Sequence, residues 1–274
     1  MHTQMSHKEQ EIYFKLLNRE KKVVSLKQLI QYEKDLSKEH ARKILFSMSK
    51  KGALYRVAKG CYIVIPPDMI ANPSKFISDP RTIIDQLMEI FDEKYYLGYQ
   101  SAAHLHGIAE QIPFVTTVVV AAQRMPIRIG QHILEFRKIS SREFFGIQRM
   151  RYADSFVNVS DLEKTILDCF ERAELCGGID EAARILSNAV EKLNDKKVIK
   201  YLQKYHNQPL YHRLGFVLDK LRQNRYTVSE KLLAEIQSRI IDNVYPLDPR
   251  ADAGRISRPW GINENVDCMR WLHA

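Results

Sequence analysis

The chain lacks the features that would mark a secreted, disulfide-linked or membrane-spanning protein. It has four cysteines, and because none stands in a C-x-x-C pair, neither a zinc clamp nor a disulfide framework is expected. It has no run of about 18 apolar residues, and its first ten residues lack the apolar stretch of a signal peptide. We therefore expect a cytoplasmic protein with no membrane partner. Its thiols should be reduced and buried: Cys61, Cys169, Cys176 and Cys268.

Motifs with fixed catalytic spacing are also absent. The sequence contains no P-loop, G-x-S-x-G, H-E-x-x-H or G-x-G-x-x-G. His104 and His106 would diverge by about 200° on a helix, so they cannot bind one metal ion without a helix break. Asp161 and Glu163 fall in the first turn of an expected helix, where negative charge complements the helix dipole. With Asp168 they form the one candidate acid cluster for phosphoryl transfer. We expect no enzyme activity and no cofactor, and a nucleotide-handling enzyme that carries a winged helix is the open alternative.

The positive charge is concentrated near the N-terminus. Residues 1–67 hold 14 Lys and Arg against 6 Asp and Glu, whereas residues 68–274 hold 28 against 27. The chain's net charge of +9 therefore comes almost entirely from the first quarter of the sequence. A concentrated positive field is what neutralisation of nucleic-acid phosphates requires, whereas a protein that is basic only for solubility would spread its charge.

Three helices are expected in the first 51 residues. Apolar side chains recur at helical spacing over residues 6–19. Ser25 is suited to cap a short second helix, and Ser37 to cap a third helix that ends before Gly52. The third helix buries one face: Ala41, Ile44, Leu45 and Met48.

The opposite face of the third helix is basic, as is typical of a recognition helix. It carries Glu39, Lys43, Phe46 and Lys50, flanked by Arg42 and Ser47. Phe46 is the outward residue that best fits the alternative, a winged helix used for protein contacts.

Two β-rich runs, residues 53–57 and 61–65, follow around a glycine-containing turn. The order of three helices and a hairpin predicts a winged helix-turn-helix, whose third helix can enter a DNA major groove about 12 Å wide. Pro66 and Pro67 begin a linker. We therefore expect a DNA-binding domain at residues 1–67 and an effector domain at residues 68–274.

We expect the DNA partner to be a double-stranded operator with repeated half-sites. Ten side chains are expected at the interface with it. Those in the first half of the third helix should approach bases or close phosphates: Ser37, Lys38, Arg42 and Lys43. Ser47 lies beside them. The others should contact phosphates and position the domain without reading sequence: Lys27, Lys50, Lys51, Arg56 and Lys59.

The remaining residues are expected to form a larger α+β domain with a mostly helical C-terminal part. Residues 114–122 are the strongest strand, followed by strands at 132–139 and 156–159. Ser160 with Glu163 predicts a capping box for the helix that follows. Trp260 and Trp271 are expected to dock their tail onto the parent domain. Helices are expected near residues 79–87, 99–107, 161–174, 179–193, 196–205, 209–223 and 229–240.

Four segments, in this order, resemble the AbiEi-type antitoxins of type IV toxin-antitoxin (abortive infection) systems. They are R-V-A-K-G-C-Y at residues 56–62, an S-A-x-x-x-H-G-like segment at 99–108, an S-D-x-x-K-T-x-x-D helix at 160–168, and the tail at 247–263. The resemblance covers most of the chain. It implies a transcriptional repressor of its own operon, whose C-terminal domain neutralises a companion toxin similar to nucleotidyltransferases.

Overall fold

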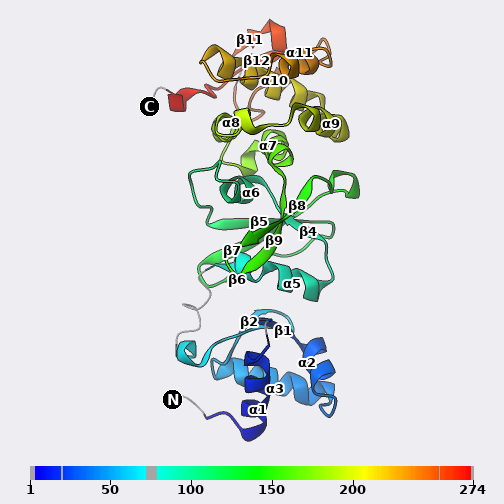
Figure 1. The fold of residues 1–274 in the computed structure, drawn as a ribbon, viewed down its shortest axis with the longest axis vertical. Helices are drawn as coiled ribbons and strands as arrows, with labels where there is room; N and C mark the ends of the chain where they lie inside the picture. Colours follow the sequence, from blue (N-terminus) through cyan, green and yellow to red (C-terminus); the bar gives the residue numbers. More distant parts are fainter. Residues whose placement is uncertain (1–3, 20, 72–78, 253, 273–274) are drawn as a thin grey trace. The chain divides into compact units, whose positions relative to one another are not determined.

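The computed structural model describes residues 4–19, 21–71, 79–252 and 254–272 and has a mixed α+β fold (Figure 1). The chain divides into two compact units. The first consists of Met1–Tyr95, Phe114–Lys138 and Arg149–Val157, and the second of Tyr96–Pro113, Ile139–Gln148 and Asn158–Ala274. The division after residue 67 that the sequence indicates stays a prediction.

The first unit begins with three capped helices. Ser6 and Ser25 each form a capping box, and the Ser37 hydroxyl accepts a hydrogen bond from the His40 amide, so the two predicted caps at Ser25 and Ser37 are confirmed. Gly52, at a φ of 81°, follows the third helix in the left-handed conformation that glycine adopts without strain. The elements are α1 (His7–Leu17), β1 (Val23–Ser25), α2 (Leu26–Tyr32), α3 (Lys38–Lys50), β2 (Leu54–Ala58) and β3 (Cys61–Val64).

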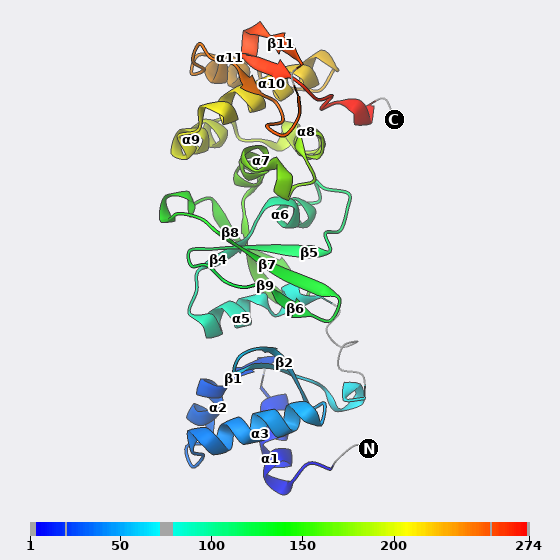
Figure 2. The same cartoon turned by 180° about the vertical axis from the view of Figure 1, so that it is seen from behind.

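A small antiparallel sheet of order β1-β3-β2 packs with these helices around one apolar core. Ile12, Leu29, Leu45 and Met48 are at most 1% exposed, and each such side chain contributes about 1.5–3 kcal/mol when fully buried. Figure 2 shows α3 running across this part of the first unit, with α1 and α2 beside it. The strand β1 was not predicted from the sequence.

The rest of the first unit contains η2 (Pro80–Thr82), α5 (Ile84–Phe91) and the strands β5 (Val115–Val120), β6 (Ile127–Ile129) and β7 (His132–Lys138). The strands are hydrogen-bonded in the order β6-β7-β5, with β5 parallel and β6 antiparallel to β7. The expected strands at 114–122 and 132–139 are therefore confirmed.

The second unit holds most of the helices, parts of three strands and three short strands near the C-terminus (Figure 2). Leu97 of β4 (Tyr95–Leu97) pairs in parallel with Val159 of β9 (Ser155–Ser160), which follows β8 (Ile147–Tyr152) in the chain. The helices are α6 (Tyr99–Leu105), α7 (Leu162–Glu171), α8 (Ile179–Ser187), α9 (Asp195–Tyr205), α10 (Gln208–Gln223) and α11 (Glu230–Gln237). Near the C-terminus, β10 (Tyr245–Pro246), β11 (Arg255–Ser257) and β12 (Ile262–Glu264) form a sheet of order β10-β12-β11.

The predicted capping box of Ser160 and Glu163 is wrong. The cap of α7 is Asp161, whose carboxylate accepts a hydrogen bond of 3.0 Å from the Lys164 amide. Ser160 still belongs to β9, so its hydroxyl contacts the Thr165 hydroxyl instead. Glu163 accepts a hydrogen bond from the Asn194 amide at the start of α9. The strand ends one residue later than the sequence pattern indicates.

The C-terminal tail docks onto α10 through Trp260, as expected. The Trp260 indole lies against Gly215 and donates a hydrogen bond of 3.0 Å to Asp219, and its carbonyl contacts His212 Nδ1 at 2.7 Å. Trp271 makes a ring contact with Tyr226. All four cysteines are buried, as expected. No helix in the described part of the chain is both long and apolar enough to span a bilayer.

Candidate nucleic-acid interface

The helix α3 separates a buried face from a charged face. Ala41, Leu45 and Met48 are at most 1% exposed, so the apolar stripe holds the helix in the core. The side chains on the opposite face are exposed, including Lys38, Arg42 and Lys43. The packing of the helix therefore fixes the direction of its basic side chains.

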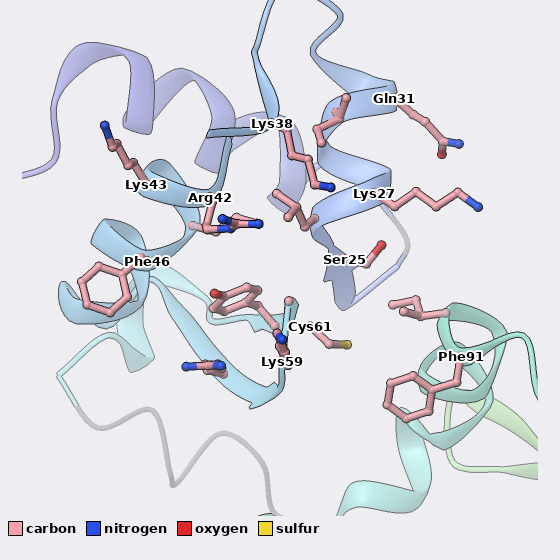
Figure 3. Close-up of a pocket in the computed structure, with 17 residues that line it drawn as sticks. Ser25, Lys27, Gln31, Lys38, Arg42, Lys43, Phe46, Lys59, Cys61 and Phe91 are labelled. Carbon is pink, nitrogen blue, oxygen red and sulfur yellow. The ribbon is translucent and has the colours of Figure 1, made fainter. Parts of the chain in front are cut away.

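Six exposed cations line one groove beside α3: Lys27, Lys38, Arg42, Lys43, Arg56 and Lys59. Lys27 comes from α2, Lys38 and Arg42 from α3, and Lys59 from the turn between β2 and β3. Figure 3 shows Lys38 and Arg42 extending into the same open space, with Lys59 below them. Apart from Lys43, none of the six forms an ion pair with any described residue. Their charge is available to an anion.

Two residues of α3 that are predicted to contact DNA interact with side chains on the same helix. Lys43 forms an exposed ion pair of 2.9 Å with Glu39, one turn earlier, and Figure 3 shows it extending away from Arg42. Such surface pairs contribute about 0.3–0.5 kcal/mol, so Lys43 can exchange partners at little cost. The Lys50 ammonium lies 5.5 Å from the centroid of the Phe46 ring, which is 54% exposed.

Ser47 and Lys51 face Glu9 of α1. The Lys51 ammonium contacts the Glu9 carboxylate at 2.7 Å, and the side chains are only 17% and 6% exposed. Burial raises the pKa of Glu9, but hydrogen bonds from Lys51, Ser47 and Ser6 outweigh it and lower the pKa to about 2. These two residues tie α3 to α1, and neither lines the groove. The S-x-x-E pattern of residues 6–9 indicates only that Glu9 caps α1 with Ser6, and not that it meets Ser47 and Lys51.

The hairpin of β2 and β3 presents its turn on the groove side. Gly60, at a φ of 71°, makes the turn, and its carbonyl accepts a hydrogen bond of 2.9 Å from the Leu26 amide at the start of α2. This bond ties the turn to α2 and positions Lys59. Arg56 of β2 is exposed and also lines the groove.

Comparison with known proteins identifies the domain that follows. Residues 96–220 match the AbiEi antitoxin C-terminal domain. The resemblance to AbiEi-type antitoxins is thereby confirmed over these residues, here called the AbiEi domain, and the match supports an antitoxin role in a toxin-antitoxin system. No curated protein matches the chain.

A solved structure shares the fold over nearly the whole chain. The crystal structure of the RV2827C protein from Mycobacterium tuberculosis superposes with a TM-score of 0.70 at 14% sequence identity. The match covers 98% of this chain and 96% of that one. At this identity the similarity shows the fold alone.

The candidate acid cluster of the AbiEi domain is engaged in structural contacts. Asp161 caps α7 and accepts a hydrogen bond of 2.8 Å from the Tyr201 hydroxyl. Asp168 is 3% exposed and forms an ion pair with Lys164, which is 1% exposed. Among the described residues, no group of three or more His, Cys, Asp or Glu side chains is placed to hold a metal ion.

Aromatic side chains enclose the buried ion pair of the AbiEi domain. The Lys164 ammonium lies 4.8 Å from the ring centroids of both Phe145 and Tyr205. The hydroxyls of Tyr205 and Tyr96 donate hydrogen bonds to Asp168. His106, the residue that follows α6, contacts the Ser160 carbonyl through Nε2 at 2.7 Å.

Proposed function

We propose that the protein is the autoregulating antitoxin of a type IV toxin-antitoxin system, in which residues 1–67 form a winged helix-turn-helix that binds double-stranded DNA. The AbiEi domain would neutralise a nucleotidyltransferase-like toxin. The support for the second half is the match at residues 96–220.

The observation that carries the DNA-binding half is a set of five exposed cations beside α3 that form no ion pair with a described residue: Lys27, Lys38, Arg42, Arg56 and Lys59. A cation that already has a carboxylate partner gains little from a phosphate, whereas an unpaired one releases a counterion when it neutralises a phosphate. Lys38 and Arg42 lie in the N-terminal half of α3, the part of a recognition helix that contacts base edges. Lys27 and Lys59 flank them on neighbouring elements, where phosphates of the same groove would pass.

We also propose that the protein has no nucleotide-transferring activity of its own. Such an activity would need Asp161 or Asp168. Asp161 caps α7, and Asp168 is buried and bound by three side chains. Metal-dependent nucleotide turnover that disappears in Asp168→Asn would instead support the enzyme alternative.

Arg42→Ala and Lys59→Ala are expected to weaken DNA binding in different ways. Arg42→Ala should reduce affinity for the operator by about 1–3 kcal/mol, because it removes a contact to a base, with a much smaller effect on random duplex. Lys59→Ala should weaken both duplexes by a similar factor, because a phosphate contact carries no sequence information. Titrations by gel shift on the two duplexes measure the difference. Lys231→Ala, which removes an exposed lysine from α11, is the control. If Arg42→Ala leaves the affinity for the operator unchanged, α3 does not contact the bases of the DNA.

The full-length triple variant with Lys38, Arg42 and Lys59 replaced by alanine is expected to lose DNA binding and still protect cells from the companion toxin. The three side chains are exposed, so the AbiEi domain should fold as before. The assay is growth with both proteins expressed from unrelated promoters, beside a filter-binding measurement. Loss of protection in a stable triple variant would show that the N-terminal residues take part in neutralisation.

A further inference from the structure

A small cavity in the second unit contains a buried arginine. Its volume is about 180 Å³, and it lies where residues of α7, α8 and α10 meet the loop at 247–250. Sites for drug-sized ligands are about 300–1,000 Å³, so this cavity fits a single small group. Arg213 of α10, which is 8% exposed, is one of its lining residues.

The guanidinium of Arg213 is only partly satisfied. Its Nε donates a hydrogen bond of 3.1 Å to the Pro246 carbonyl. Neither Nη atom forms a hydrogen bond or ion pair with any residue that the structure describes. Burial lowers the pKa of Arg213, which reflects the cost of removing this cation from water. The Nη atoms are not among the fully buried polar atoms that lack a partner, so they keep access to solvent, and Arg213 lines the cavity.

The carboxylates that line the same cavity already have partners. Asp248 is held by Arg250 through two hydrogen bonds of 3.0 and 2.9 Å. Glu174 accepts a hydrogen bond of 3.1 Å from Arg172. Burial raises the pKa of Glu171, which favours its neutral form. None of these carboxylates therefore forms a direct ion pair with Arg213, although the charges of Asp248 and Glu174 lie near enough to oppose the lowering of its pKa.

The start of α8 also lies at this cavity. Ile179, the first residue of this helix, lines the cavity, and the cap residue Gly178 provides no side chain to accept from the first turn. The first amides of a helix have no acceptor within it and favour a negative group. Asp180 also belongs to this turn, and its carboxylate is paired with Arg270.

We infer that this cavity binds a small oxyanion, a phosphate or carboxylate group, held by the two Nη atoms of Arg213. The planar guanidinium matches either group with two parallel hydrogen bonds. Arg250 contributes indirectly, because it keeps Asp248 from pairing with Arg213. The site is independent of the groove beside α3.

The test is calorimetric titration of the full-length protein with sodium phosphate and, separately, with sodium acetate, at constant ionic strength set by sodium chloride. Saturable binding of one ion is expected, and the salt that binds identifies the source of the oxyanion. Arg213→Gln should weaken this binding at least tenfold. Arg222→Gln, on the same helix and with the same change in charge, is the control and should not alter it.

Arg250→Gln is the second variant, because its side chain is 60% exposed and its loss should not affect folding. It should weaken binding several-fold by freeing Asp248 to compete for Arg213, and it decides the outcome if Arg213→Gln does not fold. Absence of saturable binding to either salt would overturn the inference. So would phosphate binding that is unchanged in the folded variants, since such binding would belong to the basic residues near α3.

Discussion

Lys164→Met is expected to lower the free energy of unfolding by about 3–5 kcal/mol, the usual cost of breaking a buried ion pair by removing one partner. Lys164 and Asp168 are almost fully buried, so the variant would leave a carboxylate in a low-dielectric site without its cation. Chemical denaturation measures the change. Adding Asp168→Asn should recover much of the loss, because the double variant has no unpaired charge.

Lys197→Met is the matched control. Lys197 pairs with Asp161 at 3.2 Å, but its side chain is 47% exposed, so its loss should cost less than about 1 kcal/mol. A similar cost for both lysine variants would mean that burial does not strengthen the pair of Lys164 and Asp168.

The effect of Lys164→Met should depend on pH. Burial raises the pKa of Asp168 above its ordinary value, although Lys164, Tyr205 and Tyr96 oppose the rise, and loss of Lys164 raises it further. A carboxyl whose pKa is higher in the folded state gives its full stabilisation below the unfolded pKa and loses it as the pH rises through the folded pKa. The difference in the free energy of unfolding between the Lys164→Met variant and the wild type should therefore be largest at neutral pH and decrease as the pH falls.

Gly215→Ala is expected to expel Trp260 from α10 and to destabilise the second unit by about 3–5 kcal/mol, as loss of a buried tryptophan does. A Cβ at position 215 would lie 2.1–2.9 Å from three atoms of the indole. Helix propensity alone would make the change stabilising by about 0.8–1 kcal/mol, so the steric effect should dominate. With Trp271→Phe as background, Trp260 is the single tryptophan, and its emission should shift to the red.

A double-mutant cycle separates these two effects. In a Trp260→Ala background the clash is gone, and Gly215→Ala should be neutral or stabilising. If the glycine substitution destabilises that background as much as the wild type, Trp260 is not the cause.

The sequence predicted the elements whose signals are local. Ser25, Ser37 and Gly52 mark helix ends through their own side chains or backbone, and each does so in the structure. The strands β1 and β4 are three residues long, too short for alternation to be detected. The cap of α7 was displaced by one residue, because Ser160 and Asp161 are both good caps and the end of β9 decides between them.

The candidate sites could be predicted only in part, because they depend on contacts between residues that are far apart in the sequence. Helical spacing places Lys38 and Arg42 outward, and both are exposed. The same spacing cannot show that Glu9, more than 35 residues earlier in the chain, binds Ser47 and Lys51. Arg213 gave no signal at all, since its unpaired state follows from where Arg250 and Arg172 place the nearby carboxylates.

The contact between Gly215 and Trp260 also shows that the segment matched by the family model differs from the unit that packs together. The family match ends at residue 220, just beyond this glycine, while the side chain that fills the space above it lies about 40 residues further along. A fragment cut at the family boundary would expose an apolar slot on α10 and leave His212 without the Trp260 carbonyl. The segment that the family model matches is therefore shorter than the unit whose packing includes Trp260, and the tail is part of that unit.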